Sequence, residues 1–213
     1  MRTVKDPEVR TEEILDAAEH LFNTKGYLHT TVNDILRAVD IAKGTFYYYF
    51  PSKEEVMNAV VNRLVAAEIK RSQAIVEDNS LNALEKFAGI LLSGGGENSE
   101  REAAIEMFNK PPNAQIHEKS FIETTRQLTP ILEKVVQQGI EEGFFETEFP
   151  RENMQLLLIT GQMMFDRDWF QSSEPEEMMR QVQAYCNLVE TLLGTKGEAK
   201  GKPTAVILES VLG

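Results

Sequence analysis

The side chains best suited to chemistry lie in one short segment, AKGTFYYYFPSKEE, at residues 42–55. Aromatic rings occupy all five positions from 46 to 50, with a lysine on each side at 43 and 53. With about 100° between successive residues of a helix, Phe46 and Phe50 share one face and Tyr48 points the opposite way. Gly44 and Thr45 lie near Tyr48. Hydroxyl groups, ammonium groups and a glycine that permits close approach suit a sugar–phosphate backbone, so the outward face indicates contact with nucleic acid.

Other reactive residue types do not form a site by their spacing. The histidines His20, His29 and His117 have no cysteine or carboxylate at a spacing that zinc ligands use. The glycines at 94–96 lack the lysine and hydroxyl of a phosphate-binding loop, and no G-x-S-x-G motif occurs. We therefore expect no catalytic residue, no metal and no cofactor, and we do not expect an enzyme.

Charge is distributed unevenly along the 213 residues. The chain has 22 Lys and Arg against 34 Asp and Glu, a net charge of −12 that by itself argues against a nucleic-acid partner. Residues 1–53, however, carry a net charge of only −1, so the acidity belongs to the rest of the chain. The lone Cys186 excludes an intrachain disulfide. The first residues lack the apolar stretch of a signal peptide, and the longest apolar run, at 156–159, is too short to span a bilayer. We expect a cytoplasmic protein without a membrane partner.

Apolar residues recur at helical spacing along nearly the whole chain, which predicts an all-α fold of about nine helices. Asp6 and Pro7 begin the first helix, Gly26 ends it, and Asp40 suits a left-handed turn between the next two helices. The predicted helices then cover about 31–39, 43–50, 53–77, 80–92, 100–109, 114–143, 151–170 and 175–194. Pro130 lies within one of them, where it either kinks the helix or marks a new start.

The elements predict three parts: a three-helix helix-turn-helix DNA-binding domain at 1–52, a larger helical domain at 53–195, and a tail at 196–213. The tail is either a short docked element or a frayed end. In a helix-turn-helix the second helix of the motif enters the DNA major groove. An exposed tyrosine cluster alone would favour a plain connector helix. Its combination with three helices, a tight turn, flanking lysines and a capped fourth helix favours DNA binding.

Residues 8–60 resemble the TetR family of bacterial transcriptional repressors. The motifs that carry the resemblance are the first-helix pattern ILDAAEHLF, the Gly-Tyr and Thr-Thr pairs that follow, the KGT-aromatic-Tyr core and the FPSKE junction. The resemblance implies DNA contacts from Thr31, Asn33, Lys43, Gly44, Thr45, Tyr47, Tyr48 and Lys53. The chain departs from the family pattern at Asp40, which is usually glycine, at Ala42, which is usually serine, and at Tyr49, which is often histidine and has no assigned role here.

The last two predicted helices are apolar on more than one side. One of them has apolar residues spaced 4-3-4-3 like a coiled-coil seam. An intramolecular core would explain this pattern, but the resemblance favours a two-fold interface between protomers. The predicted interface residues are Leu157, Gly161, Met178, Val182, Tyr185, Val189 and Leu192.

The resemblance also implies that a small-molecule effector binds between helices of the second domain. The candidate lining residues are Met107, Phe108, Phe121, Met164, Phe165, Trp169 and Tyr185, although residues of these types also form ordinary core. We thus predict a ligand-responsive transcriptional regulator, most simply a repressor, that binds palindromic double-stranded DNA as a homodimer. The alternative is an all-α ligand-sensing or protein-interaction module whose helix-turn-helix does not bind specific DNA.

Overall fold

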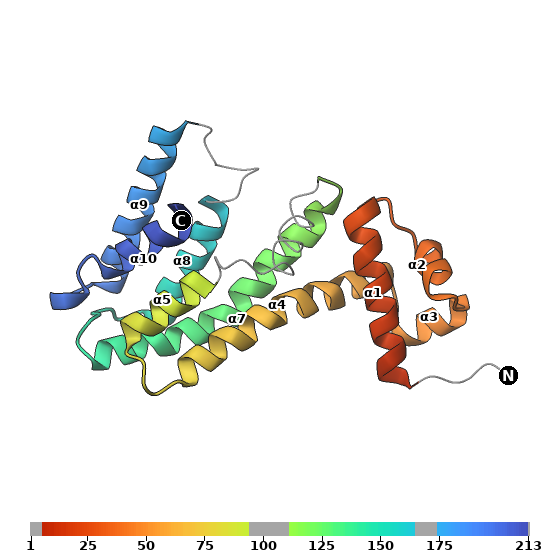
Figure 1. Ribbon diagram of the computed structural model, residues 1–213, viewed down its shortest axis with the longest axis horizontal. Coiled ribbons are helices and arrows are strands. Elements are labelled where there is room, and N and C mark those ends of the chain that lie inside the picture. Colours follow the sequence, from red (N-terminus) through yellow and green to blue (C-terminus); the bar gives the residue numbers. More distant parts are fainter. Residues whose placement is uncertain (1–5, 94–110, 165–173, 213) are drawn as a thin grey trace. The chain divides into compact units, whose positions relative to one another are not determined.

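The structure is a computed structural model that describes residues 6–93, 111–164 and 174–212. All regular structure in these ranges is helical, which confirms the all-α prediction (Figure 1). The elements are α1 (Pro7–Lys25), α2 (Val32–Val39), α3 (Lys43–Tyr49), α4 (Lys53–Glu77), α5 (Ala83–Ser93), η1 (Pro111–Asn113), α7 (Ala114–Glu141), α8 (Pro150–Met164), α9 (Pro175–Leu193), η2 (Gly197–Ala199) and α10 (Lys202–Leu212). The predicted helix at 100–109 lies outside the described residues, as does the predicted continuation of α8 to residue 170.

The first helices begin and end at the residues that the sequence indicates. The Asp6 side chain accepts a hydrogen bond from the Glu8 amide at 2.9 Å, and α1 ends at Gly26, whose φ is +85°. The turn between α2 and α3 contains Asp40 with a left-handed φ of +53°. Asp tolerates this conformation better than most residues because its short polar side chain can bond locally.

The chain divides into two compact units, one of residues 1–65 and 98–120 and the other of residues 66–97 and 121–213. The helices α4 and α7 each run from one unit into the other. In the first unit, Phe22, Ile35 and Phe46 are completely buried, so α1, α2 and α3 contribute to one core. An ion-pair cluster joins α1 to α4 in this unit, because the Arg63 guanidinium binds carboxylates of Glu12, Asp16 and Glu19 on successive turns of α1.

The second unit contains a buried apolar stripe on α9, formed by Val182, Cys186, Val189 and Leu193. The C-terminal residues form α10, which packs against α5 and α9 and buries Ile207 (Figure 1). This confirms the docked interpretation of the predicted tail.

Two other features of the second unit concern the start of α10 and the course of α7. The Glu190 carboxylate on α9 accepts hydrogen bonds from the amide and hydroxyl of Thr204, at 3.3 and 3.0 Å, and so caps the first turn of α10. Pro130 lies inside α7, which continues through it.

Across the described ranges, no helix combines the length and the apolar character that a membrane span requires.

Candidate nucleic-acid interface

The two faces of α3 differ in burial as the helical wheel predicts. Phe46 is completely buried and Phe50 is buried beside it, with 6.3 Å between the ring centroids. On the opposite side, Tyr48 is 78% exposed, and on the flank Tyr47 is 44% exposed. We call the α3 residues Lys43, Gly44, Thr45, Tyr47 and Tyr48 the recognition face.

Gly44 lies on an open part of the recognition face. A Cβ atom built at this position meets no atom within 4 Å. Glycine inside a helix costs about 0.5–1 kcal/mol relative to alanine, and packing within this chain does not require it. A glycine here therefore suits the close approach of a partner.

Tyr49, which had no assigned role, lies against Tyr48 with their rings edge to face and 5.1 Å between centroids. The same two tyrosines line a shallow hollow on the surface together with residues of the first turns of α1, including Pro7, Glu8 and Thr11. Tyr49 is half-buried, and its edge-to-face contact with the exposed Tyr48 ring is a geometry that aromatic pairs prefer.

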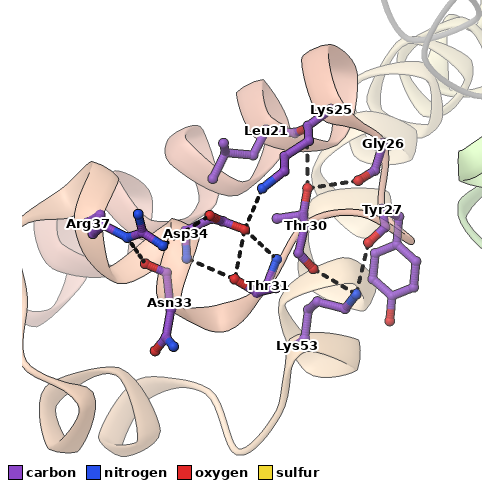
Figure 2. A network of polar contacts seen from close by, with 10 residues as sticks. All are labelled: Leu21, Lys25, Gly26, Tyr27, Thr30, Thr31, Asn33, Asp34, Arg37 and Lys53. Atoms are coloured by element: carbon purple, nitrogen blue, oxygen red, sulfur yellow. Dashed lines mark hydrogen bonds and ion pairs between the residues drawn. The ribbon is translucent and has the colours of Figure 1, made fainter.

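The start of α2 is fixed by a capping box (Figure 2). The Thr31 hydroxyl accepts from the Asp34 amide at 3.2 Å, and an Asp34 carboxylate oxygen accepts from the Thr31 amide at 2.8 Å. Lys25 from α1 also binds that oxygen at 2.7 Å, and Arg37 lies 3.6 Å from the other oxygen. Hydrogen bonds from Lys25 and Thr31 hold the pKa of Asp34 well below its usual range. Sequence reasoning missed Asp34, although a Thr followed three residues later by an acid is a recognisable capping signal.

The turn between α1 and α2 is bound by Lys53, the first residue of α4 (Figure 2). Its ammonium group donates to the carbonyls of Tyr27 at 2.8 Å and Thr30 at 2.9 Å, and lies 4.0 Å from the Tyr27 ring centroid. Burial lowers the pKa of Lys53. The Thr30 hydroxyl donates to the Gly26 carbonyl at 2.7 Å and closes the turn from inside. Lys53 thus stabilises the motif, and its contact with DNA stays a prediction.

The remaining predicted DNA contacts, Thr31 and Asn33, lie at the N-terminal end of α2. Both residues are exposed, and the Asn33 carbonyl accepts from the Arg37 side chain at 3.4 Å. The structure therefore brings the predicted contacts of α2 and α3 together on one helix-turn-helix, all of them exposed except the half-buried Thr45. Within the described residues, no group of three or more His, Cys, Asp or Glu side chains is placed to hold a metal ion.

The predicted effector-site residues are only partly described. Phe121, Met164 and Tyr185 are half-buried in the second unit, whereas Met107, Phe108, Phe165 and Trp169 lie outside the described residues. The Tyr185 hydroxyl donates to the Leu157 carbonyl at 2.9 Å, and burial raises the pKa of Tyr185 to about 12. A Cβ atom at Gly161 would lie 2.5 Å from that hydroxyl oxygen. Gly161 and Tyr185 therefore serve close packing of α8 on α9 within one chain.

Apart from Gly161 and Tyr185, the predicted dimer seam divides into two sets. Leu157, Val182 and Val189 are buried by their own chain, and their part in a dimer interface stays a prediction. Their periodicity reflects the intramolecular packing of α8 and α9. Met178 and Leu192 are only half-buried. The apolar surface that α8 does expose contains Leu156, 53% exposed, and Ile159, 41% exposed, which the predicted set omits.

The capped α2, the left-handed turn and the exposed face of α3 define a helix-turn-helix protein of the DNA-binding class. Residues 14–60 match the family model for bacterial regulatory proteins of the tetR family, and residues 96–188 match the model for the tetracyclin repressor-like C-terminal domain. The chain belongs to the tetR family of bacterial regulatory proteins, and it is a transcriptional regulator.

Individual relatives support the same assignment. The HTH-type transcriptional repressor KstR2 of Mycolicibacterium smegmatis is 26% identical over 149 residues, which cover 68% of this chain and 72% of that protein. Among solved structures, Salmonella enterica GusR is 18% identical, with a TM-score of 0.58 over 90% of this chain and 98% of that chain. RolR in complex with resorcinol is 17% identical, with a TM-score of 0.59 over 94% and 93% of the two chains. These two structures share the fold of this chain.

Proposed function

We propose that this regulator is a repressor that binds a palindromic DNA operator as a homodimer in the cytoplasm and is released by a small-molecule effector. The observation that carries the proposal is the recognition face of α3. It combines a lysine, two exposed tyrosines and a glycine in open space on a helix whose opposite face is fixed in the core. The repressors among its relatives support the direction of regulation.

The proposed DNA contacts divide by element. Lys43, Gly44, Thr45, Tyr47 and Tyr48 would approach the major groove from α3, and Thr31 and Asn33 would approach a phosphate from α2. Lys53 would add its charge near the backbone. The Asp34 amide in the first turn of α2 is capped by Thr31. The amides of Val32 and Asn33 lie at the positive end of the helix dipole and suit a phosphate. Because few cations take part, the affinity should decrease with added salt by a modest slope.

The homodimer would place two recognition faces in successive major grooves, about one helical turn of DNA apart. In the second unit, Leu156 and Ile159 on α8 offer exposed apolar surface for a partner protomer, with the half-buried Met178 and Leu192 of α9 as further candidates. Contiguous exposed apolar patches are typical of association surfaces.

The effector would bind in the second unit near Phe121, Met164 and Tyr185. The solved relatives RolR and SmeT hold resorcinol and triclosan, respectively, which supports a small organic molecule for this chain. Such a molecule would release DNA only if it binds the two conformations of the dimer unequally.

Selection of binding sites from random double-stranded DNA tests the proposal. We expect the wild-type protein to enrich a palindrome and to bind it with two protomers per site, as measured by light scattering of the complex. Failure to enrich any sequence, in a protein that is folded by circular dichroism, would favour the alternative of a ligand-sensing or protein-interaction module without specific DNA binding.

A further inference from the structure

A buried asparagine joins the start of α7 to the DNA-binding helices. Asn113, the last residue of η1, is completely buried. Its side-chain oxygen accepts from the Tyr27 amide at 2.6 Å, and its side-chain nitrogen donates to the Phe22 carbonyl at 3.0 Å. A third hydrogen bond runs from the Leu28 amide to the Pro112 carbonyl at 3.1 Å. All of these residues belong to the first unit.

Asn113 binds two backbone groups where α1 ends: the Tyr27 amide, and the Phe22 carbonyl, which also accepts from the Gly26 amide at 3.1 Å. Phe22 lies in the last turn of α1, and Tyr27 follows Gly26, where the backbone leaves the helix with φ +85°. A buried amide without a partner is strongly unfavourable. Asparagine offers an acceptor and a donor on one planar group, which matches an N–H and a C=O that lie close together. A Cβ atom at Gly26 would lie 2.4 Å from the Pro112 Cβ, so glycine permits this close approach.

The same turn is bound from a second element. Lys53, at the start of α4, holds the carbonyls of Tyr27 and Thr30, while Asn113 holds the Tyr27 amide. The peptide groups on both sides of Tyr27 are therefore fixed by the first residues of α4 and the residue before α7. Thr31, the N-cap of α2, comes directly after this turn.

We infer that Asn113 is a positioning residue for DNA binding: it fixes the α1–α2 turn and thereby sets where the N-terminus of α2 meets the DNA backbone. The inference rests on the proposed function. It assigns to the start of α7 a direct connection with the DNA-binding motif, separate from the covalent connection through α4. A change in α7 that breaks these hydrogen bonds would release the turn and displace Thr31.

A double-mutant cycle on the palindrome obtained by selection tests the inference. We expect Asn113→Ala to weaken binding about tenfold, whereas Gln115→Ala, an exposed neighbour on α7, leaves it unchanged. If Asn113 acts through the turn, Asn113→Ala should weaken DNA binding much less in a protein that already carries Thr31→Ala. The effects of Asn113→Ala and Lys43→Ala, on different elements, should instead multiply. If the losses of affinity from Asn113→Ala and Thr31→Ala multiply fully, the inference is wrong. It is also wrong if Asn113→Ala binds DNA with wild-type affinity.

Amide hydrogen exchange gives a readout that does not depend on DNA. The Tyr27 amide should exchange much faster in Asn113→Ala than in the wild type, with the core amides of α1 unchanged. Asn113→Asp, which keeps the acceptor for Tyr27 but loses the donor to Phe22, should protect Tyr27 partly and serves if the alanine variant does not fold. Unchanged exchange at Tyr27 would overturn the inference even if the protein binds DNA. A wild-type protein without specific DNA binding would overturn the proposed function, while the exchange experiment would still test the contact.

Discussion

The two units differ in how their predicted functional residues relate to the core. On α3 in the first unit, the predicted contacts are polar or exposed, and Tyr48 lies opposite the buried Phe46. On α9 in the second unit, the predicted seam contains Val182 and Val189, which turn out to be core residues of a single chain. Residues that contact a polar partner differ from core residues both in residue type and in their position around the helix. Residues that serve an apolar partner have the same type and the same phase as the core, so periodicity alone cannot distinguish them.

The largest effect that tests this difference is expected from Val189→Arg. Val189 is buried by its own chain, so the substitution places a charge in the core of the second unit. An unpaired buried charge costs several kcal/mol, and we expect loss of the cooperative unfolding transition in circular dichroism and not a folded monomer.

The matched variant on the exposed side of α8 is Leu156→Arg. Because Leu156 is 53% exposed in the single chain, the substitution should change the stability of the protomer fold itself by no more than about 0.5 kcal/mol. If α8 forms the proposed dimer contact, light scattering should give half the mass of the wild-type protein. A folded, monomeric Val189→Arg protein would instead restore the original seam assignment.

Much of the first unit could be predicted from the sequence because its signals are local. Asp6, Pro7 and Gly26 determine α1 through neighbours in the chain, and Asp40 determines the turn before α3. The role of Asn113 could not be predicted, because its partners Phe22 and Tyr27 lie about 90 residues earlier and no local pattern connects them.

Within α3 the next largest effect should come from Phe46→Ala. This ring is completely buried, and its removal should lower the free energy of unfolding by about 3–5 kcal/mol. Urea denaturation followed by circular dichroism measures the loss. A loss below about 1 kcal/mol would show that the apolar face of α3 is not part of a close-packed core.

Tyr48→Ala, two residues further along the same helix, should leave the stability almost unchanged and weaken DNA binding. Its side chain is 78% exposed, so the unfolding midpoint should remain close to that of the wild type. Binding to the selected palindrome should weaken by about 1–3 kcal/mol, because an exposed ring of the recognition face is removed. Fluorescence anisotropy measures this loss, and wild-type affinity would show that the outward face of α3 does not contact the DNA.

The lysine at the start of α4 shows why a residue type alone does not establish a contact. Lys53 follows the aromatic segment at a position where the resemblance implies DNA binding, yet its ammonium is bound to the carbonyls of Tyr27 and Thr30. Lys43 and Lys53 are equivalent by charge in the sequence. Only the folded chain distinguishes the exposed lysine of the recognition face from the one that holds the turn.

The smallest effect, and one that depends on pH, is expected from Asp34→Asn. The amide can keep the capping hydrogen bonds with Thr31 but loses the ion pairs with Lys25 and Arg37. Because folding lowers the pKa of Asp34, its carboxylate stabilises the native state above the unfolded pKa of about 4, and this contribution is lost as the pH falls toward the lower folded value. The variant should therefore be less stable than the wild type at pH 7, and the difference should shrink below about pH 4. Urea denaturation of both proteins at a series of pH values measures this difference in the free energy of unfolding. A difference that stays constant across the series would show that the ion pairs with Asp34 do not stabilise the start of α2.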